Sequence, residues 1–155
     1  MKGDAMTITM SQAERESEGF IARREETAKL IVRVTVGVLI LLHTWAVVNG
    51  EEAIRDTLAS WGLPVALAWT AVIFEGVAPI MVILGIYARL GAWMMTFWMV
   101  MAFALAHIHT GHLFQLAQSG VGWRVEGPFF FLALSVVVAL QGAGRHGLNI
   151  GGRWN

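Results

Sequence analysis

The sequence predicts an all-α fold, in which four transmembrane helices form a bundle, an N-terminal cytoplasmic helix precedes them, and an amphipathic external loop joins spans 1 and 2. Three observations lead to this prediction. Hydrophobic residues make up 56% of the 155 residues and charged residues only 14%, with a mean hydropathy of +0.61, whereas about a quarter of the residues in soluble proteins are charged. Four apolar stretches follow a polar N-terminal segment, and basic residues gather on one side of them.

Residues 1–27 form the first element. They are polar and carry both signs of charge, Ser11 and Glu14 have the spacing of a capping box, and good helix formers follow. The first apolar stretch begins near Ala28, too late and after too many acidic residues for a cleaved signal peptide. We therefore expect a retained cytoplasmic tail or helix over 1–27, followed by a four-span membrane domain over 28–155.

Four apolar stretches have close to the length of membrane helices. A helix needs about 20 residues, within a range of about 17–25, to cross the hydrocarbon core. The last stretch is short and contains Ser135 and Gln141, so it requires a thin or tilted local environment. The predicted spans are Ala28–Val48, Val65–Ile86, Leu90–Ile108 and Pro128–Ala143.

The positions of the basic residues predict the orientation. With the N-terminus in the cytoplasm, nine basic residues lie on that side and only Arg55 and Arg124 on the other, as the positive-inside rule requires. Both termini are then cytoplasmic. The first external loop, NGEEAIRDTLASWGLP, ends in an amphipathic piece that we expect to lie on the outer surface, near an aromatic belt. The belt tryptophans are Trp45, Trp61, Trp69 and Trp123.

The composition excludes several classes of function. No cysteine is present, which excludes thiolate catalysis, disulfide exchange and cysteine-ligated zinc or iron–sulfur sites. Eleven basic and eleven acidic residues balance, so the charge gives no sign of nucleic-acid binding. A chain of this length with four spans has no room for a soluble catalytic domain. Any chemistry therefore lies inside the bundle or at its rim.

Glu75 stands inside the apolar run VIFEGVAPIMVILG, where an acidic side chain costs about 2.5–3.5 kcal/mol of insertion free energy. By helical rise, His43, His107 and Glu126 fall at the same level of the other three helices, in the outer half. Such groups face inward and pair with each other or line a polar cavity. Two interpretations stay open: the four residues relay protons, with His43, Glu75 and His107 contacting a quinone, or they form hydrogen bonds that only hold the helices together.

The histidine-rich stretch AHIHTGHLF has three residues of a type that ligates metals. In a regular helix His107 and His109 point about 200° apart, and only His109 and His112 lie within about 60° of each other. We therefore expect no metal site, and His109 and His112 are the pair that would form one. A haem between His43 and His107 is not expected either, because the helices carry bulky side chains where a macrocycle needs clearance.

Four further features of the sequence predict local structure and not a functional site. Pro79 has no N–H for the carbonyl of Glu75, so the helix should kink there and free that carbonyl. Arg33, five residues into the first span, should extend to the inner surface, and Arg89 should anchor the topology in a tight inner turn. The methionines and aromatic residues of WMMTFWMVMAF (93–103) should pack against helices or lipid.

Several motifs give the chain a family resemblance. RVTVGVLILLH, LASWGLP, FEGVAPIMVILGIYARLGAW, MVMAFALAH, EGPFFFLAL and GAGRHGLN occur in this order over nearly everything after residue 30. In these motifs the chain resembles the DoxX family of small four-helix bacterial membrane proteins. Thr44 stands where the family pattern has a glycine followed by a lysine, and Asn149 where it has an acidic residue. The resemblance implies that the polar positions of the family correspond in this chain to Arg33, His43, Glu75, Arg89, His107, Glu126 and Arg145.

The resemblance implies a quinone-linked or redox-associated subunit in a bacterial inner membrane. Together with the polar cluster it predicts an integral membrane subunit of a larger redox or energy-converting complex, whose partners are the lipid bilayer and other membrane subunits. A scaffolding subunit without a cofactor and a stand-alone quinone-linked oxidoreductase are the alternatives. Enzymatic activity stays open, and the lack of an intrinsic electron carrier in the sequence favours an accessory subunit over an independent enzyme.

Overall fold

The computed structural model describes residues 2–49, 58–59, 62–104, 116, 122, 125–148 and 150–155. Most of these residues form helices and turns, and Ile86 and Ile150 form an isolated β-bridge. The α-helices are α1 (Lys2–Asn49), α3 (Ala68–Ala71), α4 (Ala78–Leu84), α5 (Ala88–Ala102) and α6 (Glu126–Gln141). A 3-10 turn (Val65–Leu67), a π-helical turn (Val72–Val77) and a second 3-10 turn (Gly152–Trp154) complete the order.

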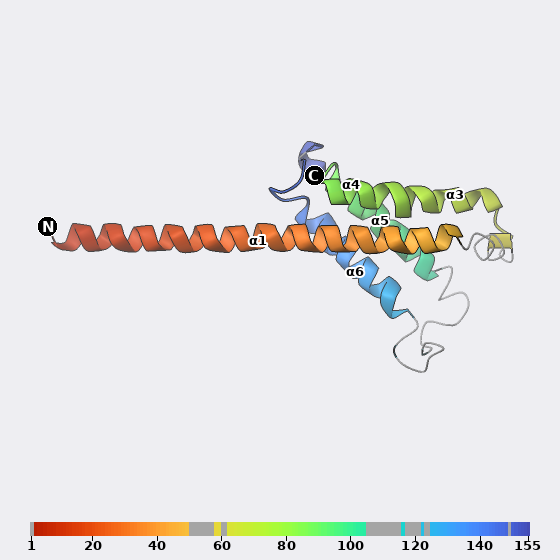
Figure 1. Cartoon of the computed structure of the whole chain (residues 1–155), viewed down its shortest axis with the longest axis horizontal. Coiled ribbons are helices and arrows are strands. Elements are labelled where there is room, and N and C mark those ends of the chain that lie inside the picture. The colour runs from red at the N-terminus through yellow and green to blue at the C-terminus, as the bar shows by residue number, and fades with distance from the viewer. Residues whose placement is uncertain are drawn as a thin grey trace.

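Four of these helices close into a bundle. Helix α1 packs against α4 and α6, and α5 packs against the same two helices from the other side, as Figure 1 shows. Apolar residues from α1, α4, α5 and α6 fill the centre of the bundle, and each of these helices turns one face toward it. The buried core consists of Val36, Ile40, Ala78, Val82, Ala92, Met95, Val138 and Ala139. The prediction of an all-helical, four-helix arrangement is thus confirmed over the described residues.

Small residues let the helices approach closely. A Cβ added to Gly37 on α1 would lie 2.5 Å from Ile83 Cγ1 of α4, and one added to Gly91 on α5 would lie 2.9 Å from the Ala78 carbonyl oxygen. A side chain at Gly37 therefore requires Ile83 to move, and one at Gly91 requires the backbone of α4 to move. Close backbone approach at small residues is how helices associate in membranes, where lipid tails remove the usual hydrophobic drive.

Helix α1 is much longer than a single membrane crossing. Its 48 residues extend about 72 Å at a rise of about 1.5 Å per residue, and its N-terminal half projects away from the bundle (Figure 1). The predicted tail helix therefore continues into the first apolar stretch without a break. Ser11 does not start the helix, as its capping-box spacing suggested: the helix begins at Lys2, and the Ser11 hydroxyl accepts a hydrogen bond from Arg15.

Among the described helices, α1 alone contains an apolar stretch long enough to cross a membrane, within Ser11–Trp45. Only 28% of that stretch is buried, whereas a core helix of a soluble protein would be mostly covered. Trp45 and Trp69, at the end of the bundle away from the N-terminus, are 71% and 69% exposed. The other predicted spans match shorter or interrupted helices, so crossing by all four stays a prediction. Most of the amphipathic loop, including Trp61, lies outside the described residues, and so does Trp123.

The C-terminal segment, residues 142–148 and 150–155, folds back over the turn between α4 and α5. Leu148 N–H donates to the Leu84 carbonyl (3.1 Å), and Tyr87 N–H donates to the Ile150 carbonyl (2.8 Å). Gly85 makes this turn possible, because its φ of 69° is left-handed and its Cα faces that of Gly147 with no room for a side chain.

Arg33 fastens this segment to α1. Its side chain is 1% exposed, and its guanidinium donates to the carbonyls of Ala143 (2.8 Å) and His146 (3.1 Å). The expectation that Arg33 extends to the inner surface is therefore wrong. The chain returns over this end of the bundle and offers carbonyl acceptors to two guanidinium nitrogens in place of water, whereas Nε is buried without a partner among the described atoms.

Candidate functional site

Glu75 lies in the π-helical turn Val72–Val77 and is buried, with 6% of the residue exposed. The local sequence explains the departure from α geometry. Pro79 follows four residues later at the start of α4 and cannot donate to the Glu75 carbonyl. The disruption expected beside Glu75 is thus observed, in the form of a π turn, a feature that is frequent at functional sites.

Thr44 of α1 satisfies the carbonyl that Pro79 leaves free. Its hydroxyl lies 2.6 Å from the Glu75 carbonyl oxygen and 2.8 Å from the carbonyl oxygen of Ile40, so one hydroxyl hydrogen serves both acceptors. Thr44 is itself 8% exposed. This contact sets Glu75 level with the last turns of α1, at the end of the bundle away from Arg33.

The carboxylate of Glu75 is held by a tryptophan of α5. Trp98 Nε1–H donates to Glu75 Oε1 at 2.5 Å, and the Trp98 ring stacks on Phe74 with centroids 5.3 Å apart and planes inclined by 3°. The expectation that residues 93–103 pack against helices or lipid is confirmed for Met95 and Met99, which are buried, and for Trp98, which stacks on Phe74 and also donates a hydrogen bond that was not predicted. An indole N–H is a donor with no acceptor function, so it complements a carboxylate.

The other predicted cluster residues are placed differently. His43 lies on the exposed side of α1, within electrostatic range of Glu75, and its ring is tilted against Phe131 of α6 at 6.0 Å. Glu126 is exposed in the first turn of α6, and over the described ranges no hydrogen bond or ion pair joins it to Glu75. The structure therefore brings His43 near Glu75 and leaves Glu126 at the surface.

His107, His109 and His112 lie outside the described residues. The quinone contact of His107 thus stays a prediction, as does the expectation that neither the His109–His112 pair binds a metal nor His107 a haem. Among the residues that the structure describes, no three histidine, aspartate or glutamate side chains gather as metal ligands would.

One carboxylate oxygen of Glu75 has no hydrogen-bond partner in the part of the chain that the structure describes. Oε2 is buried and has no hydrogen-bond partner among the described protein atoms, while Oε1 is paired with Trp98. A buried polar atom without a partner costs about 1–3 kcal/mol, so it is seldom kept without a use. Oε2 can hold a proton and donate it, or accept a hydrogen bond from a hydroxyl. The site is thus a buried carboxyl group with one fixed oxygen and one free oxygen beside an aromatic stack.

The DoxX family model matches residues 28–108, more than half of the chain. The chain belongs to the DoxX family. Membership makes it a membrane protein, in agreement with the apolar and largely uncovered stretch of α1. No curated protein and no solved structure matches this DoxX chain closely enough to be compared with it.

The DoxX match covers the membrane half of α1, Glu75, Trp98 and the turn at Gly85. Helix α6 and the C-terminal segment lie beyond it, although they complete the bundle and bind Arg33. Thr44, which stands where the family resemblance led us to expect glycine, is inside the match and contacts Glu75. This DoxX protein therefore supports the glutamate backbone through a residue outside the expected pattern.

Proposed function

We propose that this DoxX protein is a four-span subunit of a larger redox or energy-converting complex in a bacterial inner membrane, and that Glu75 contacts a quinone or relays a proton there. The observation that carries the proposal is the free Oε2 of Glu75, buried while its sister oxygen is bound by Trp98. Ionisable residues within membrane helices are costly and usually belong to a ligand or proton pathway.

The residues around Glu75 fit a quinone headgroup. A bound quinone supplies two-electron, two-proton redox chemistry and presents carbonyl oxygens on a flat ring. Oε2, when protonated, donates to such a carbonyl, and when ionised accepts from the hydroxyl of the reduced form. Phe74 and Trp98 stack on each other next to the carboxyl group. His43, within electrostatic range of Glu75, is the second member of the proposed relay that the structure describes near this carboxyl group.

The proposed topology places Glu75 in the external half of the membrane. The run Val65–Leu84 has 20 residues and spans about 30 Å, close to the hydrocarbon thickness. Helix α6, with 16 residues, reaches about 24 Å and needs local thinning or flanking turns. Lys29, Arg33, Arg89, Arg145 and Arg153 belong to the opposite end of the bundle. The positive-inside rule then makes that end cytoplasmic.

Quinone retention tests the site. The wild-type protein and Glu75→Gln are purified in mild detergent and extracted with organic solvent, and quinone is quantified by its absorbance. Glutamine keeps the shape and the acceptor oxygen for Trp98 but cannot hold or release the proton. We expect quinone content to fall at least about tenfold, corresponding to about 1.4 kcal/mol. Glu25→Gln, an exposed change on α1, is the matched control and should retain quinone.

Two results would count against this proposal. Equal quinone content in Glu75→Gln and in the wild type would show that the carboxyl group does not hold the cofactor. A wild-type protein without quinone, together with a Glu75→Gln variant that only unfolds more easily, would make the glutamate a structural residue.

The second candidate function, a scaffolding subunit, is favoured by the projecting part of α1. This part carries Phe20 and Ile21, which are 60% and 56% exposed, on a helix that the rest of the chain does not cover (Figure 1). Deleting residues 2–22 leaves Glu26 and Arg33 in place. We expect the shortened protein to fold and to lose partners that co-purify with the full chain, as identified by mass spectrometry. Unchanged co-purification would show that residues 2–22 do not contribute to partner binding.

A further inference from the structure

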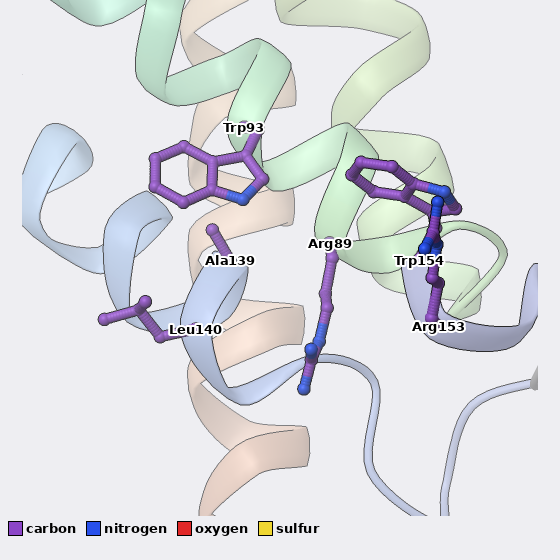
Figure 2. Close-up of a pocket in the computed structure, with 6 residues that line it drawn as sticks. All are labelled: Arg89, Trp93, Ala139, Leu140, Arg153 and Trp154. Carbon is purple, nitrogen blue, oxygen red and sulfur yellow. The ribbon is translucent and has the colours of Figure 1, made fainter.

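A second polar site lies at the other end of the bundle from Glu75. A cavity of about 510 Å³ opens between the start of α5, the end of α6 and the last turn of the chain, within the volume range of about 300–1,000 Å³ that is usual for ligand sites. Figure 2 shows Arg89 between the apolar residues on one side and the Arg153–Trp154 pair on the other. The lining residues are Arg89, Trp93, Ala139, Leu140, Arg153 and Trp154.

The charge of this cavity is positive. Two guanidinium groups line it, and none of its lining side chains is acidic. Arg153 is positioned by its contact with the Trp154 ring, 5.6 Å from the centroid. Arg89 Nε is buried and has no hydrogen-bond acceptor among the described protein atoms. A buried N–H of a guanidinium group without an acceptor calls for an anion or an equivalent ligand group.

The other walls of the cavity are apolar and open outward. Trp93 lies one helical turn after Arg89 on the same face of α5 and is 45% exposed, while Leu140 of α6 is 65% exposed. A ligand in this cavity therefore contacts cationic groups at the bundle end and apolar side chains along the helices. A phospholipid at the membrane surface has this arrangement of charge and hydrocarbon.

We infer that this cavity binds a phosphate group through Arg89 and Arg153, and the apolar wall of Trp93 and Leu140 favours the phosphate of an anionic phospholipid over free phosphate. Arginine suits this role because its planar fork donates two parallel hydrogen bonds to phosphate oxygens. The backbone oxygen of Asn155 lies on the same side of Gly142 as Arg89 Nε, because a Cβ added to Gly142 would lie 2.5 Å from the oxygen and 2.8 Å from Nε. Two guanidinium groups leave positive charge for the ligand.

Native mass spectrometry of the detergent-purified full chain tests the inference. Phosphatidylglycerol is titrated into the wild type, Arg89→Gln, Arg153→Gln and Arg145→Gln, with phosphatidylcholine as the zwitterionic comparison and inorganic phosphate as the competing free anion. Detergent removes the surface potential of a bilayer, so general attraction to anionic lipid does not hide the site. Arg145→Gln removes an equal charge from the same segment outside the cavity lining.

We expect one phosphatidylglycerol to bind per chain more tightly than phosphatidylcholine, with affinity about tenfold weaker in Arg89→Gln and Arg153→Gln and within about twofold of wild type in Arg145→Gln. Binding of inorganic phosphate with the same arginine dependence, but no preference for the lipid, supports the site with free phosphate as its ligand. Equal lipid binding by all variants, or no binding of either probe, overturns the inference. Arg89→Lys, which keeps the charge, and circular dichroism separate loss of binding from loss of fold.

Discussion

The Thr44 hydroxyl donates a hydrogen bond of 2.6 Å to the backbone carbonyl of Glu75, the carbonyl that Pro79 cannot serve. The contact joins α1 to the π turn at the depth of the candidate site. It fixes the backbone that carries the carboxyl group, so the direction of Glu75 depends on a residue of another helix.

Replacing Thr44 by valine keeps the shape of the side chain and removes its hydroxyl. The Glu75 carbonyl then stays buried without this donor, and we expect the free energy of unfolding to fall by about 1–2 kcal/mol. Denaturant titration in detergent measures the change. Thr44→Ser retains the hydroxyl and should lose less. Wild-type stability in Thr44→Val would show that the π turn needs no support from α1.

The sequence predicted those parts of the fold that residues close together in the chain determine. The apolar stretches located the end of α1, the run Val65–Leu84, the start of α5 and both ends of α6 to within a few residues, because burial against lipid or neighbouring helices follows composition. Pro79 predicted the disrupted helix, because a missing N–H is a local property. The start of α1 at Lys2 and the buried state of Arg33 were not predicted. The second depends on carbonyls of Ala143 and His146, which lie 110 and 113 residues away.

Replacing Trp98 by phenylalanine should uncouple the carboxyl group from α5. Phenylalanine can still stack on Phe74, but Glu75 Oε1 loses its donor, and we expect about 1–3 kcal/mol of destabilisation. A double-mutant cycle of Trp98→Phe with Glu75→Met, which removes the acceptor oxygen at similar side-chain length, isolates the pair, and a coupling energy of about 1 kcal/mol or more is expected. Strict additivity of the two changes would mean that the hydrogen bond contributes nothing.

Part of the site could have been predicted from the sequence. Glu75 was identified because a carboxyl group in an apolar run is expensive, and this needs no tertiary information. Trp98 was missed, although it lies 12 residues after Ile86 and Glu75 lies 11 before it. Two helices joined by a tight turn bring such equidistant residues to one level. Which face each residue occupies depends on the π turn, and for that reason the pairing required the structure.

Replacing Arg33 by methionine should release the C-terminal segment while the bundle stays folded. The guanidinium of Arg33 holds two carbonyls of this segment, whereas an apolar side chain of similar length fills the same space without donors. Global stability is a poor readout, because replacing a buried charge by an apolar group can be neutral. Hydrogen exchange is the better measurement, and amides of residues 143–148 should exchange at least about tenfold faster, with α5 unchanged.

Arg23→Met is the matched control, because Arg23 is exposed on the same helix before the bundle. It should leave exchange in residues 143–148 as in the wild type. If Arg33→Met leaves this exchange unchanged as well, the backbone bonds of Leu148 and Tyr87 hold the segment by themselves.

Glu26, which precedes the first predicted span, should make the attachment of the C-terminal segment pH-dependent. The hydrogen bond from Lys29, at 2.7 Å, and the one from the Arg145 backbone N–H lower the pKa of the Glu26 carboxyl group below its ordinary value of 4.5. A lowered pKa in the folded state means that ionised Glu26 stabilises the fold above its unfolded pKa and that this contribution is lost as the pH falls through the folded value.

Thermal unfolding of the wild type and Glu26→Gln between pH 7 and pH 3 measures this contribution. We expect the wild type to be more stable at pH 7 and its advantage to shrink as the pH falls below 4.5. A constant difference between the two proteins across this range would contradict the role of the ionised carboxylate.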